Sequence, residues 1–311
     1  MAARARLDAE LVRRKLARSR EQARELIEAG QVTVNGVLAA KPATNVSRDT
    51  PIVVSDDGPR DDWASRGAHK LLGALERFEP QGLTVSGKRC LDAGASTGGF
   101  TDVLLRRGAS EVVAVDVGYG QLVWRLQSDE RVDVHDRTNV RHLRGEDIGG
   151  LVDIVVADLS FISLSLVLPA FAASVRPGAD LLPMVKPQFE VGKERVGSGG
   201  VVRDPWLRAE AVYRVARDAA SLGLMTRDVV ASPLPGPSGN VEYFLWLTYR
   251  PDENDSAEYR FDERPTGERH TDAHRSRPAA RADDTVEENG EGEGDGRLWE
   301  MIHRAVDEGP R

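Results

Sequence analysis

The chain has 311 residues, a length typical of two ordinary domains or one large domain, and 40% of them are hydrophobic, enough to bury a core. The formal net charge is −8, but it is unevenly distributed. Residues 251–296 hold fifteen Asp and Glu against six Arg, whereas residues 1–50 hold ten Lys and Arg against six acidic residues. An acidic segment near the C-terminus therefore masks a basic N-terminal end.

Cysteine usage and hydropathy exclude several protein classes. The single cysteine, Cys90, excludes a disulfide framework and a Cys-rich metal site and is typical of a reducing cytosol. No apolar run approaches membrane-spanning length, and the N-terminus "MAARARLDAELVRRK" lacks the apolar centre of a signal peptide. The six histidines are scattered without ligand spacing. We expect a cytoplasmic protein with no membrane partner and no catalytic metal; the sequence does not indicate an oligomeric state.

Residues 6–54 predict a small α+β unit. Asp8 is placed to cap a first helix that carries Leu16 on its apolar face. Ser19 is placed to start a second helix, with Gln22 positioned for a capping box. The string "QVTVNGVLA" predicts a strand that turns back at Asn-Gly, and "TPIVV" predicts another short strand.

Basic residues gather between the two predicted helices, at Arg13, Arg14, Lys15, Arg18 and Arg20. A solvated helix face is an equally good interpretation of this cluster alone. The order of elements in "RLDAELVRRKLARSREQARELIEAGQVTVNG", however, resembles the RNA-binding fold first known from small-subunit ribosomal protein four. The resemblance implies phosphate contacts to structured RNA, which supply affinity but not sequence choice. The predicted RNA-binding set is Arg4, Arg6, Arg13, Arg14, Lys15, Arg18, Arg20 and Lys41.

From residue 89 onward, predicted strands and helices alternate. The strands are "RCLDAG", "EVVAVDVG", "VDVHDRTNV", "VDIVVADLSF" and "DLLPMVKP". This alternation is typical of a parallel sheet with helices on both faces. The last two strands, "TRDVVASPL" and "VEYFLWLTYR", follow each other directly, so we expect an antiparallel partner at one edge. The predicted fold class is α/β: a small N-terminal α+β domain, then a Rossmann-like domain with a mostly parallel sheet.

The loop after the first strand, in "LDAGASTGGFTDVLL", restricts the choice of ligand. A P-loop ends in Gly-Lys-Ser/Thr, but here Gly99 is followed by Phe100. A dinucleotide loop needs Gly where Ser96 stands. An acid two residues before the first Gly instead resembles S-adenosylmethionine sites, whose ligand carries an ammonium group and no phosphate. Asp116, after the second strand, is placed to accept hydrogen bonds from ribose hydroxyls. A plain strand-to-helix turn with packing glycines is the simpler alternative.

Four polar residues are predicted to converge at the carboxyl ends of the strands, where open α/β sheets bind ligands. Lys70 opens the helix before the first strand, and Asp158 ends the fourth. Lys186 ends the fifth strand, and Glu242 begins the last. Each alone is typical of a strand-end charge that reaches water or forms one salt bridge. Together they match the Lys-Asp-Lys-Glu order of ribose 2′-O-methyltransferases of the FtsJ/RrmJ type.

The chain as a whole resembles the TlyA family of rRNA methyltransferases, once described as haemolysins. The strings "SRGAHKL", "VADLSFISL", "VKPQFEVGK" and "PLPGPSGNVEYFLWL" carry the resemblance, which covers about residues 4–250 and the final "RLWEMIHRAVDEGP". It implies S-adenosylmethionine as cofactor, rRNA or ribosomal subunits rather than DNA as partner, and cytidine 2′-O-methylation in 16S and 23S rRNA. The implied cofactor contacts are Asp92, Ala93, Gly94, Ser96, Thr97, Gly98, Gly99, Phe100, Asp116, Val117, Asn139 and Asp158.

These motifs divide the chain into five parts. They are an RNA-binding domain (1–54), a linker (55–64), a methyltransferase domain (65–250), an acidic insertion (251–296) and a C-terminal helix (297–311). The insertion has few apolar groups, so we expect it to be disordered. The linker reads Asp61-Asp62-Trp63-Ala64 where the family pattern has Arg-Ala-Trp-Val, which leaves its part in RNA or cofactor binding open.

A ribose 2′-hydroxyl ionises far above neutral pH, so methyl transfer from a sulfonium needs that oxygen aligned and relieved of its proton. A lysine with a lowered pKa can take the proton or stabilise the oxyanion. We predict Lys186 for this role, beside Asp158 and Lys70, with Glu242 holding the lysine or the ribose. Much of the acceleration would come from positioning.

Three other functions remain open from the sequence. A membrane-lytic protein needs an amphipathic or spanning segment, and none is visible. A non-catalytic ribosome-assembly factor has no need of an intact four-residue set and an unbroken loop. A base methyltransferase commonly carries an Asn/Asp-Pro-Pro-Tyr/Phe motif at the fourth strand or a nucleophilic Cys, and "ADLSF" has neither.

Overall fold

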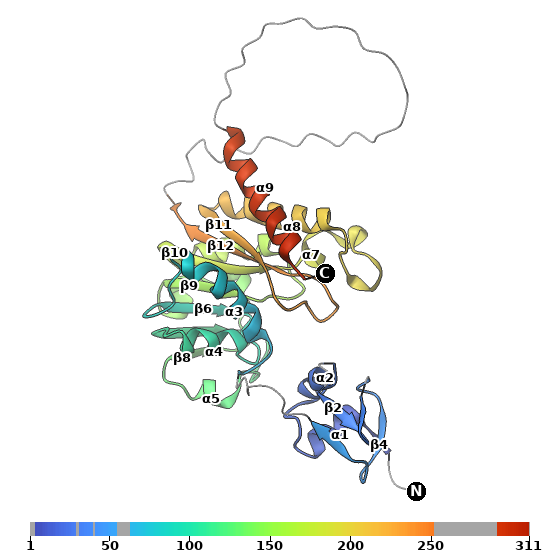
Figure 1. The fold of residues 1–311 in the computed structure, drawn as a ribbon. Coiled ribbons are helices and arrows are strands. Elements are labelled where there is room, and N and C mark those ends of the chain that lie inside the picture. Colours follow the sequence, from blue (N-terminus) through green and yellow to red (C-terminus); the bar gives the residue numbers. More distant parts are fainter. Residues whose placement is uncertain (1–3, 29–30, 40, 55–62, 252–290, 311) are drawn as a thin grey trace, which may run out of the picture. The chain divides into compact units, whose positions relative to one another are not determined.

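The computed structural model describes residues 4–28, 31–39, 41–54, 63–251 and 291–310 (Figure 1). The chain forms two compact units, with the division between Asp62 and Trp63. Among the described residues, no helix is both long enough and apolar enough to cross a membrane.

The N-terminal unit is built from two helices and two small antiparallel sheets. Its elements are β1 (Arg4–Arg6), α1 (Leu7–Arg13), α2 (Arg20–Glu28), β2 (Val32–Val34), β3 (Val37–Leu38), β4 (Asn45–Ser47) and β5 (Ile52–Val54). β1 pairs with β4, and β2 lies between β3 and β5. Asn35 and Gly36 both have positive φ, of 52° and 78°, so the predicted Asn-Gly hairpin is confirmed. The core of the unit contains Leu7, Leu11, Ala23, Ile27, Val32 and Val46.

Of the two helix N-caps predicted in this unit, one is wrong and one is confirmed. The prediction that Asp8 caps the first helix is wrong: Arg6 is the N-cap residue, and Asp8 lies buried in the first turn. Leu16 follows the helix and is 38% exposed. Ser19 does cap α2, because its Oγ accepts a hydrogen bond from the Gln22 backbone at 3.1 Å. The Gln22 side chain accepts in turn from the Arg18 backbone at 2.6 Å.

The second unit contains a seven-stranded sheet in the order β11-β12-β10-β9-β6-β7-β8. The strands are β6 (Arg89–Ala93), β7 (Glu111–Val115), β8 (Val132–His135), β9 (Val152–Ala157), β10 (Val175–Val185), β11 (Leu224–Ala231) and β12 (Tyr243–Tyr249). The five strands from β6 to β10 are parallel. β12 inserts between β10 and β11 and is antiparallel to both, which confirms the expected antiparallel edge.

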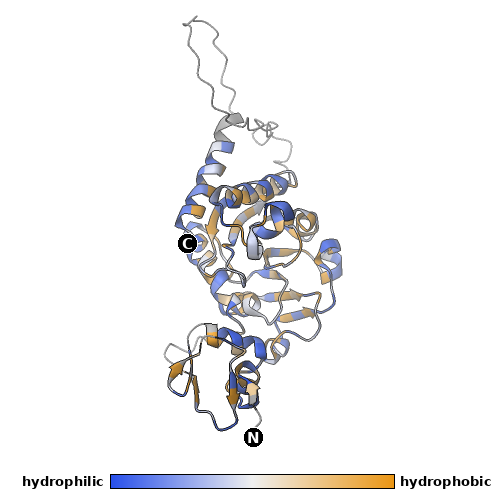
Figure 2. Cartoon of the chain, turned by 90° about the vertical axis from the view of Figure 1, so that its right-hand side faces the viewer, coloured by the Kyte–Doolittle hydropathy of each residue, from blue (hydrophilic) through white to orange (hydrophobic). Residues whose placement is uncertain are grey.

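Helices cover both faces of this sheet (Figures 1 and 2). They are α3 (Gly67–Phe78), α4 (Gly99–Arg106), α5 (Trp124–Gln127), α6 (Leu168–Ala172), α7 (Pro187–Glu190), α8 (Pro205–Ala220) and α9 (Glu291–Glu308). Short 3-10 turns lie at Glu79–Gln81, Val140–His142, Gly145–Ile148, Leu164–Leu166, Lys193–Arg195 and Ser198–Gly200. One core joins α3 and α4 to one face of the sheet, and the other joins α6, α8 and α9 to the opposite face. Burial of both faces explains why the central strands are continuous apolar runs.

The boundaries of this unit differ from the prediction at both ends. Trp63 and Ala64 belong to it rather than to the linker: the Arg106 guanidinium lies 4.1 Å from the centroid of the Trp63 ring, and the Ala64 backbone donates to Asp102 Oδ2 at 2.9 Å. The C-terminal helix begins at Glu291 rather than at residue 297, so residues 291–296 are helical and not disordered. Asp61, Asp62 and residues 252–290 lie outside the described part of the chain.

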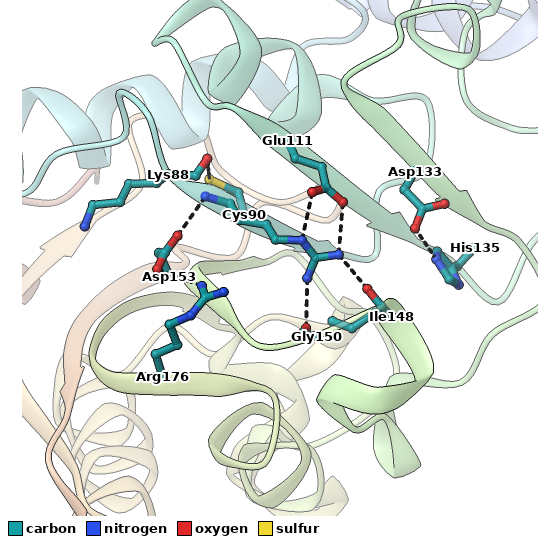
Figure 3. A network of polar contacts seen from close by, with 10 residues as sticks. Lys88, Cys90, Glu111, Asp133, His135, Ile148, Gly150, Asp153 and Arg176 are labelled. Atoms are coloured by element: carbon teal, nitrogen blue, oxygen red, sulfur yellow. Dashed lines mark hydrogen bonds and ion pairs between the residues drawn. The ribbon is translucent and has the colours of Figure 1, made fainter.

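At the amino ends of the strands, Arg89 forms hydrogen bonds with Glu111, Ile148, Gly150 and Asp153. Figure 3 labels these four partners. Its guanidinium forms two 2.9 Å contacts with Glu111 and donates to the carbonyls of Ile148 and Gly150. Its backbone N–H donates to Asp153 at 2.9 Å. These polar groups satisfy one another's hydrogen-bonding capacity, so we interpret this edge of the sheet as structural.

Candidate active site

The topology brings the four predicted polar residues to the carboxyl edge of the sheet. Asp158 follows β9 and Lys186 follows β10, and these parallel strands end side by side. Glu242 precedes β12, which is antiparallel, so its first residues lie at the same edge as the last residues of β10. Lys70 reaches this edge from the first turn of α3.

The four side chains form a continuous chain of alternating charges. Lys186 Nζ lies 2.6 Å from Asp158 Oδ1, and Lys70 Nζ lies 3.3 Å from Asp158 Oδ2. Lys70 Nζ also donates to Glu242 Oε2 at 2.7 Å. The contact of Lys186 with Asp158 is an ion pair, and its ammonium group donates a hydrogen bond to Ser160 Oγ at 3.1 Å. Glu242 therefore contacts Lys70 rather than Lys186.

Burial makes this pairing necessary. The side-chain exposures are 12% for Lys70, 7% for Lys186 and 1% for Glu242. Burial alone would lower the pKa of Lys70, but the Asp158 and Glu242 carboxylates raise it above its ordinary value. Burial alone would raise the pKa of Asp158, but Lys70 and Lys186 lower it. Lys70 is thus held protonated between two carboxylates.

A cavity of ≈ 840 Å³ adjoins the cluster, with Lys186 and Glu242 on its wall. Glu242 Oε1 has no hydrogen-bond partner among the described residues. Phe161, also on the wall, is 90% exposed at a φ of 63°, with its ring centroid 5.3 Å from that of Phe189. Sequence reasoning missed Ser160, Phe161 and Phe189; their only signal is that they follow the ends of β9 and β10 in the quoted strings.

The Gly-rich loop lies beside the same cluster. Gly94 has φ 86°, and a Cβ there would lie 2.8 Å from the Asp158 carbonyl oxygen. Gly98 has φ 97° and is the N-cap residue of α4. Both positions need glycine for backbone conformation and packing. These two glycines therefore also serve the alternative role given above, a close turn between strand and helix. That packing places the loop against the end of β9.

The acidic residues of the loop differ in their environments. Asp92 is fully buried: its Oδ2 accepts from Thr101 Oγ1 at 2.6 Å, and its Oδ1 has no partner among the described residues. Burial raises the pKa of Asp92 to about 7. Asp116 holds the loop, because its two oxygens accept from the Ser96 backbone at 2.8 Å and the Gly118 backbone at 2.7 Å.

The remaining predicted cofactor residues are spread along the same edge. Val117 is 71% exposed directly after Asp116. Asn139 caps a 3-10 turn by accepting from the Arg141 backbone at 3.0 Å. Phe100 packs its ring against Phe244 in the core, so only its backbone can face a ligand. Within the described residues, no group of three or more His, Cys, Asp or Glu side chains has the arrangement of a metal site.

In the N-terminal unit, two buried carboxylates organise the predicted cations. Asp8 pairs with Arg6 and Arg20, each at 3.0 Å, and these partners lower its pKa. Glu10 pairs with Arg13 at 2.6 Å and Arg14 at 2.8 Å, which lower its pKa to about 2.

The predicted cations of this unit do not all face solvent. Arg14 also donates to the backbone carbonyls of Ser47, Arg48 and Thr50, so its guanidinium is used inside the unit. Lys15, Arg18 and Lys41 are exposed, and the side chain of Arg4 is not among those described.

Comparisons with known proteins match both units. The model of the FtsJ-like methyltransferase family matches residues 63–249, and that of the S4 domain matches residues 5–52. The chain is 63% identical to the 16S/23S rRNA (cytidine-2′-O)-methyltransferase TlyA of Mycobacterium tuberculosis, over 83% of this chain and 94% of that protein. It is 32% identical to the 23S rRNA (cytidine-2′-O)-methyltransferase TlyA of Campylobacter jejuni, over 76% and 96% of the two chains.

A protein named Hemolysin A, from Brachyspira hyodysenteriae, is 35% identical over 72% of this chain and 92% of its own. Among solved structures, one described as a hemolysin from Streptococcus thermophilus has 36% identity and a TM-score of 0.64. It covers 82% of this chain and 94% of its own.

Proposed function

Because this chain belongs to the FtsJ-like methyltransferase family, and within it to the TlyA group, we propose that it methylates a ribose 2′-hydroxyl of ribosomal RNA with S-adenosylmethionine as donor. The relatives' names point to cytidine in 16S and 23S rRNA. The single observation that carries the proposal is the buried cluster Lys186–Asp158–Lys70–Glu242, open to a cavity at the carboxyl edge of the sheet.

The geometry divides the work between the two lysines. Lys186 lines the cavity, so its ammonium group can reach a 2′-oxygen placed there. Lys70 is held between two carboxylates with a raised pKa, so it positions Asp158 and Glu242 and keeps its own proton. We assign to Lys186 the stabilisation of the developing oxyanion or, once its side chain is a neutral amine, the removal of the hydroxyl proton. The oxygen would bond to the methyl carbon as the bond from that carbon to the sulfonium sulfur breaks, which leaves S-adenosylhomocysteine.

The target nucleotide would occupy the cavity. Phe161 presents an open aromatic face there, and base stacking on such a face contributes about 1–3 kcal/mol per base. Glu242 also lines the cavity, and its buried Oε1 has no hydrogen-bond partner among the described residues. A ribose between these groups would have its 2′-hydroxyl aligned before reaction, and such alignment supplies much of the acceleration in methyl transfer.

The charge of the loop fits S-adenosylmethionine, which supplies an electrophilic methyl group on a sulfonium. The segment from Asp92 to Phe100 contains no cation, and Asp116 and Asp158 lie close enough to Asp92 to raise its pKa further. A cationic ligand relieves this repulsion, whereas a phosphate would add to it. The residues we propose to hold the cofactor are those of the loop, Asp92–Phe100, together with Asp116, Val117, Asn139 and Asp158.

We assign RNA anchoring to the N-terminal unit. The buried carboxylates of Asp8 and Glu10 pair with other cations of the unit. Three further predicted cations are exposed, namely Lys15, Arg18 and Lys41. Arg6, Arg13 and Arg20 keep side-chain exposures of 44%, 49% and 56% while paired, so they are oriented at the surface. Oriented guanidinium groups match phosphate geometry with little entropy left to lose.

Mass mapping of rRNA from cells with and without the protein tests the proposal. The expected result is a cytidine 14 mass units heavier (the mass of one methyl group in place of hydrogen), with the modification on the ribose after nucleoside analysis. A methyl group on the base would instead favour the base methyltransferase. An unchanged map together with release of dye from vesicles by the pure protein would favour the membrane-lytic alternative.

A further inference from the structure

A second cationic pocket lies beside the edge strand β11, apart from the catalytic cluster. Its volume is ≈ 410 Å³, and α3, β11 and α9 all contribute to its wall. Four guanidinium groups face only two carboxylates, which gives the pocket a net charge of +2. The lining residues are Arg77, Gln81, Arg227, Asp228, Arg297, Glu300, Met301 and Arg304.

Asp228 organises one half of this pocket. Its side chain is 3% exposed and accepts from Arg77 Nε at 3.0 Å, Gln81 Nε2 at 2.7 Å and an Arg304 terminal nitrogen at 2.5 Å. These contacts fix α3 and α9 to the edge strand. They also fix the orientation of two guanidinium groups, which remain about 40% exposed.

Among the described side chains, the other half of the pocket has no such partner. Arg227 and Arg297 are exposed, and neither lies within 4.0 Å of a carboxylate in the described part of the chain. The register of β11 against β12 shifts between Thr226 and Asp228, so Arg227 is the extra residue of a bulge, a feature that re-aims a side chain. Its guanidinium lies 5.7 Å from the centroid of the Trp246 ring.

The pocket lies within reach of an RNA bound at the active site. Arg77 follows Lys70 by seven residues on α3, which places both on the same face of the helix, separated by roughly 10 Å along its axis. We propose that this pocket binds a backbone phosphodiester of the RNA substrate, as a second anchoring point on the methyltransferase unit. The inference rests on the proposed function, because it takes RNA as the bound substrate.

The test compares Arg227→Gln/Arg297→Gln with Arg144→Gln, which removes an exposed arginine near the amino edge of the sheet. Affinity for ribosomal subunits from cells lacking the protein is measured against salt concentration, and methyl transfer is measured separately. Each lost phosphate contact should reduce the salt slope by about 0.7–0.9. We expect a reduction of about one unit and a raised KM in the double variant, with kcat at saturating RNA unchanged.

A salt slope and KM equal to those of the Arg144 control would overturn the proposal. So would loss of pyrophosphate binding, measured by calorimetry, with an unchanged RNA slope, because the pocket would then be a site for a free anion. The proposed function would be wrong if the wild-type protein transferred no methyl group. This RNA-binding site would still be supported if the salt slope of wild-type RNA binding were larger than that of the double variant.

Discussion

Lys70 Nζ donates a hydrogen bond to Glu242 Oε2 at 2.7 Å, across 172 positions of the sequence. The contact joins the first turn of α3 to the residue before β12 and orients Glu242, whose other oxygen has no partner among the described residues and whose side chain lines the cavity. Both groups are largely buried, so the Glu242 carboxylate depends on Lys70, and Lys70 without Glu242 keeps only Asp158.

Replacing Glu242 should therefore affect stability and turnover in different ways. Glu242→Leu leaves Lys70 buried with Asp158 alone, and removing one partner of a buried pair costs about 3–5 kcal/mol. Lys70→Met/Glu242→Leu removes both charges and should recover most of that loss, but it should not recover methyl transfer. Urea unfolding and a methyl-transfer assay measure the two effects. Equal destabilisation by the single and double changes would show that the two residues are not coupled.

Asp92 should make stability depend on pH. Its pKa of about 7 in the folded protein lies above the value near 3.9 expected for the unfolded chain. The folded state therefore binds the proton more tightly, and this contribution is complete below pH 4 and is lost as pH rises through 7. The Asp92→Asn variant cannot ionise at this position, so it should not lose this contribution. As pH rises from 4 to 7, the unfolding free energy of the wild type should therefore fall relative to that of the variant by up to about 4 kcal/mol.

Urea unfolding at a series of pH values, without cofactor, checks this result. Addition of S-adenosylmethionine should reduce the pH dependence of the wild type, because a bound ammonium group favours the ionised carboxylate. Parallel pH profiles for the two proteins would mean that Asp92 does not carry the shifted pKa.

The N-terminal cations should separate into two kinds. Arg18 is exposed, whereas Arg20 pairs with the buried Asp8. Arg18→Ala should lower RNA affinity and reduce the salt slope by about 0.7–0.9 without changing stability. Arg20→Ala should do the same and also lower the melting temperature. Filter binding across salt concentrations and calorimetric melting distinguish the two, and an unchanged slope in both variants would place the RNA contacts on other residues.

The sequence predicted that Lys70, Asp158, Lys186 and Glu242 lie together but not how they pair. Asp158, Lys186 and Glu242 each stand next to a strand end, and strand ends can be located from apolar runs. The contact of Glu242 with Lys70 depends on β12 lying antiparallel beside β10, which only the tertiary fold determines. The cavity residue Phe161 carries no local signal beyond its place after β9.

Two predictions failed because a local rule competed with a distant contact. Asp8 has the right residue type for a cap, but ion pairs to Arg6 and Arg20 draw it into the first turn. Residues 291–296 have the composition of a disordered segment, yet they continue a helix whose apolar side, at Leu298 and Ile302, packs in the core. Neither the arginine partners of Asp8 nor the core against which the C-terminal helix packs can be read from local composition.

Lys186 supports the sharpest test of the mechanism. Its side chain is 7% exposed, contacts Asp158 at 2.6 Å and lines the cavity proposed for the ribose. Lys186→Ala should abolish methyl transfer while RNA and cofactor binding remain, because its charge is needed mainly in the transition state. Lys186→Arg should also be nearly inactive, since guanidinium keeps its proton and has a different reach.

The matched control is Lys88→Ala, which removes an exposed lysine beside the opposite edge of the sheet and should retain full turnover. Single-turnover kinetics with pre-bound subunits separate chemistry from binding. Substantial turnover by the Arg variant would make Lys186 a fixed cation and send the proton to Glu242 or water; an active Ala variant would remove Lys186 from the mechanism altogether.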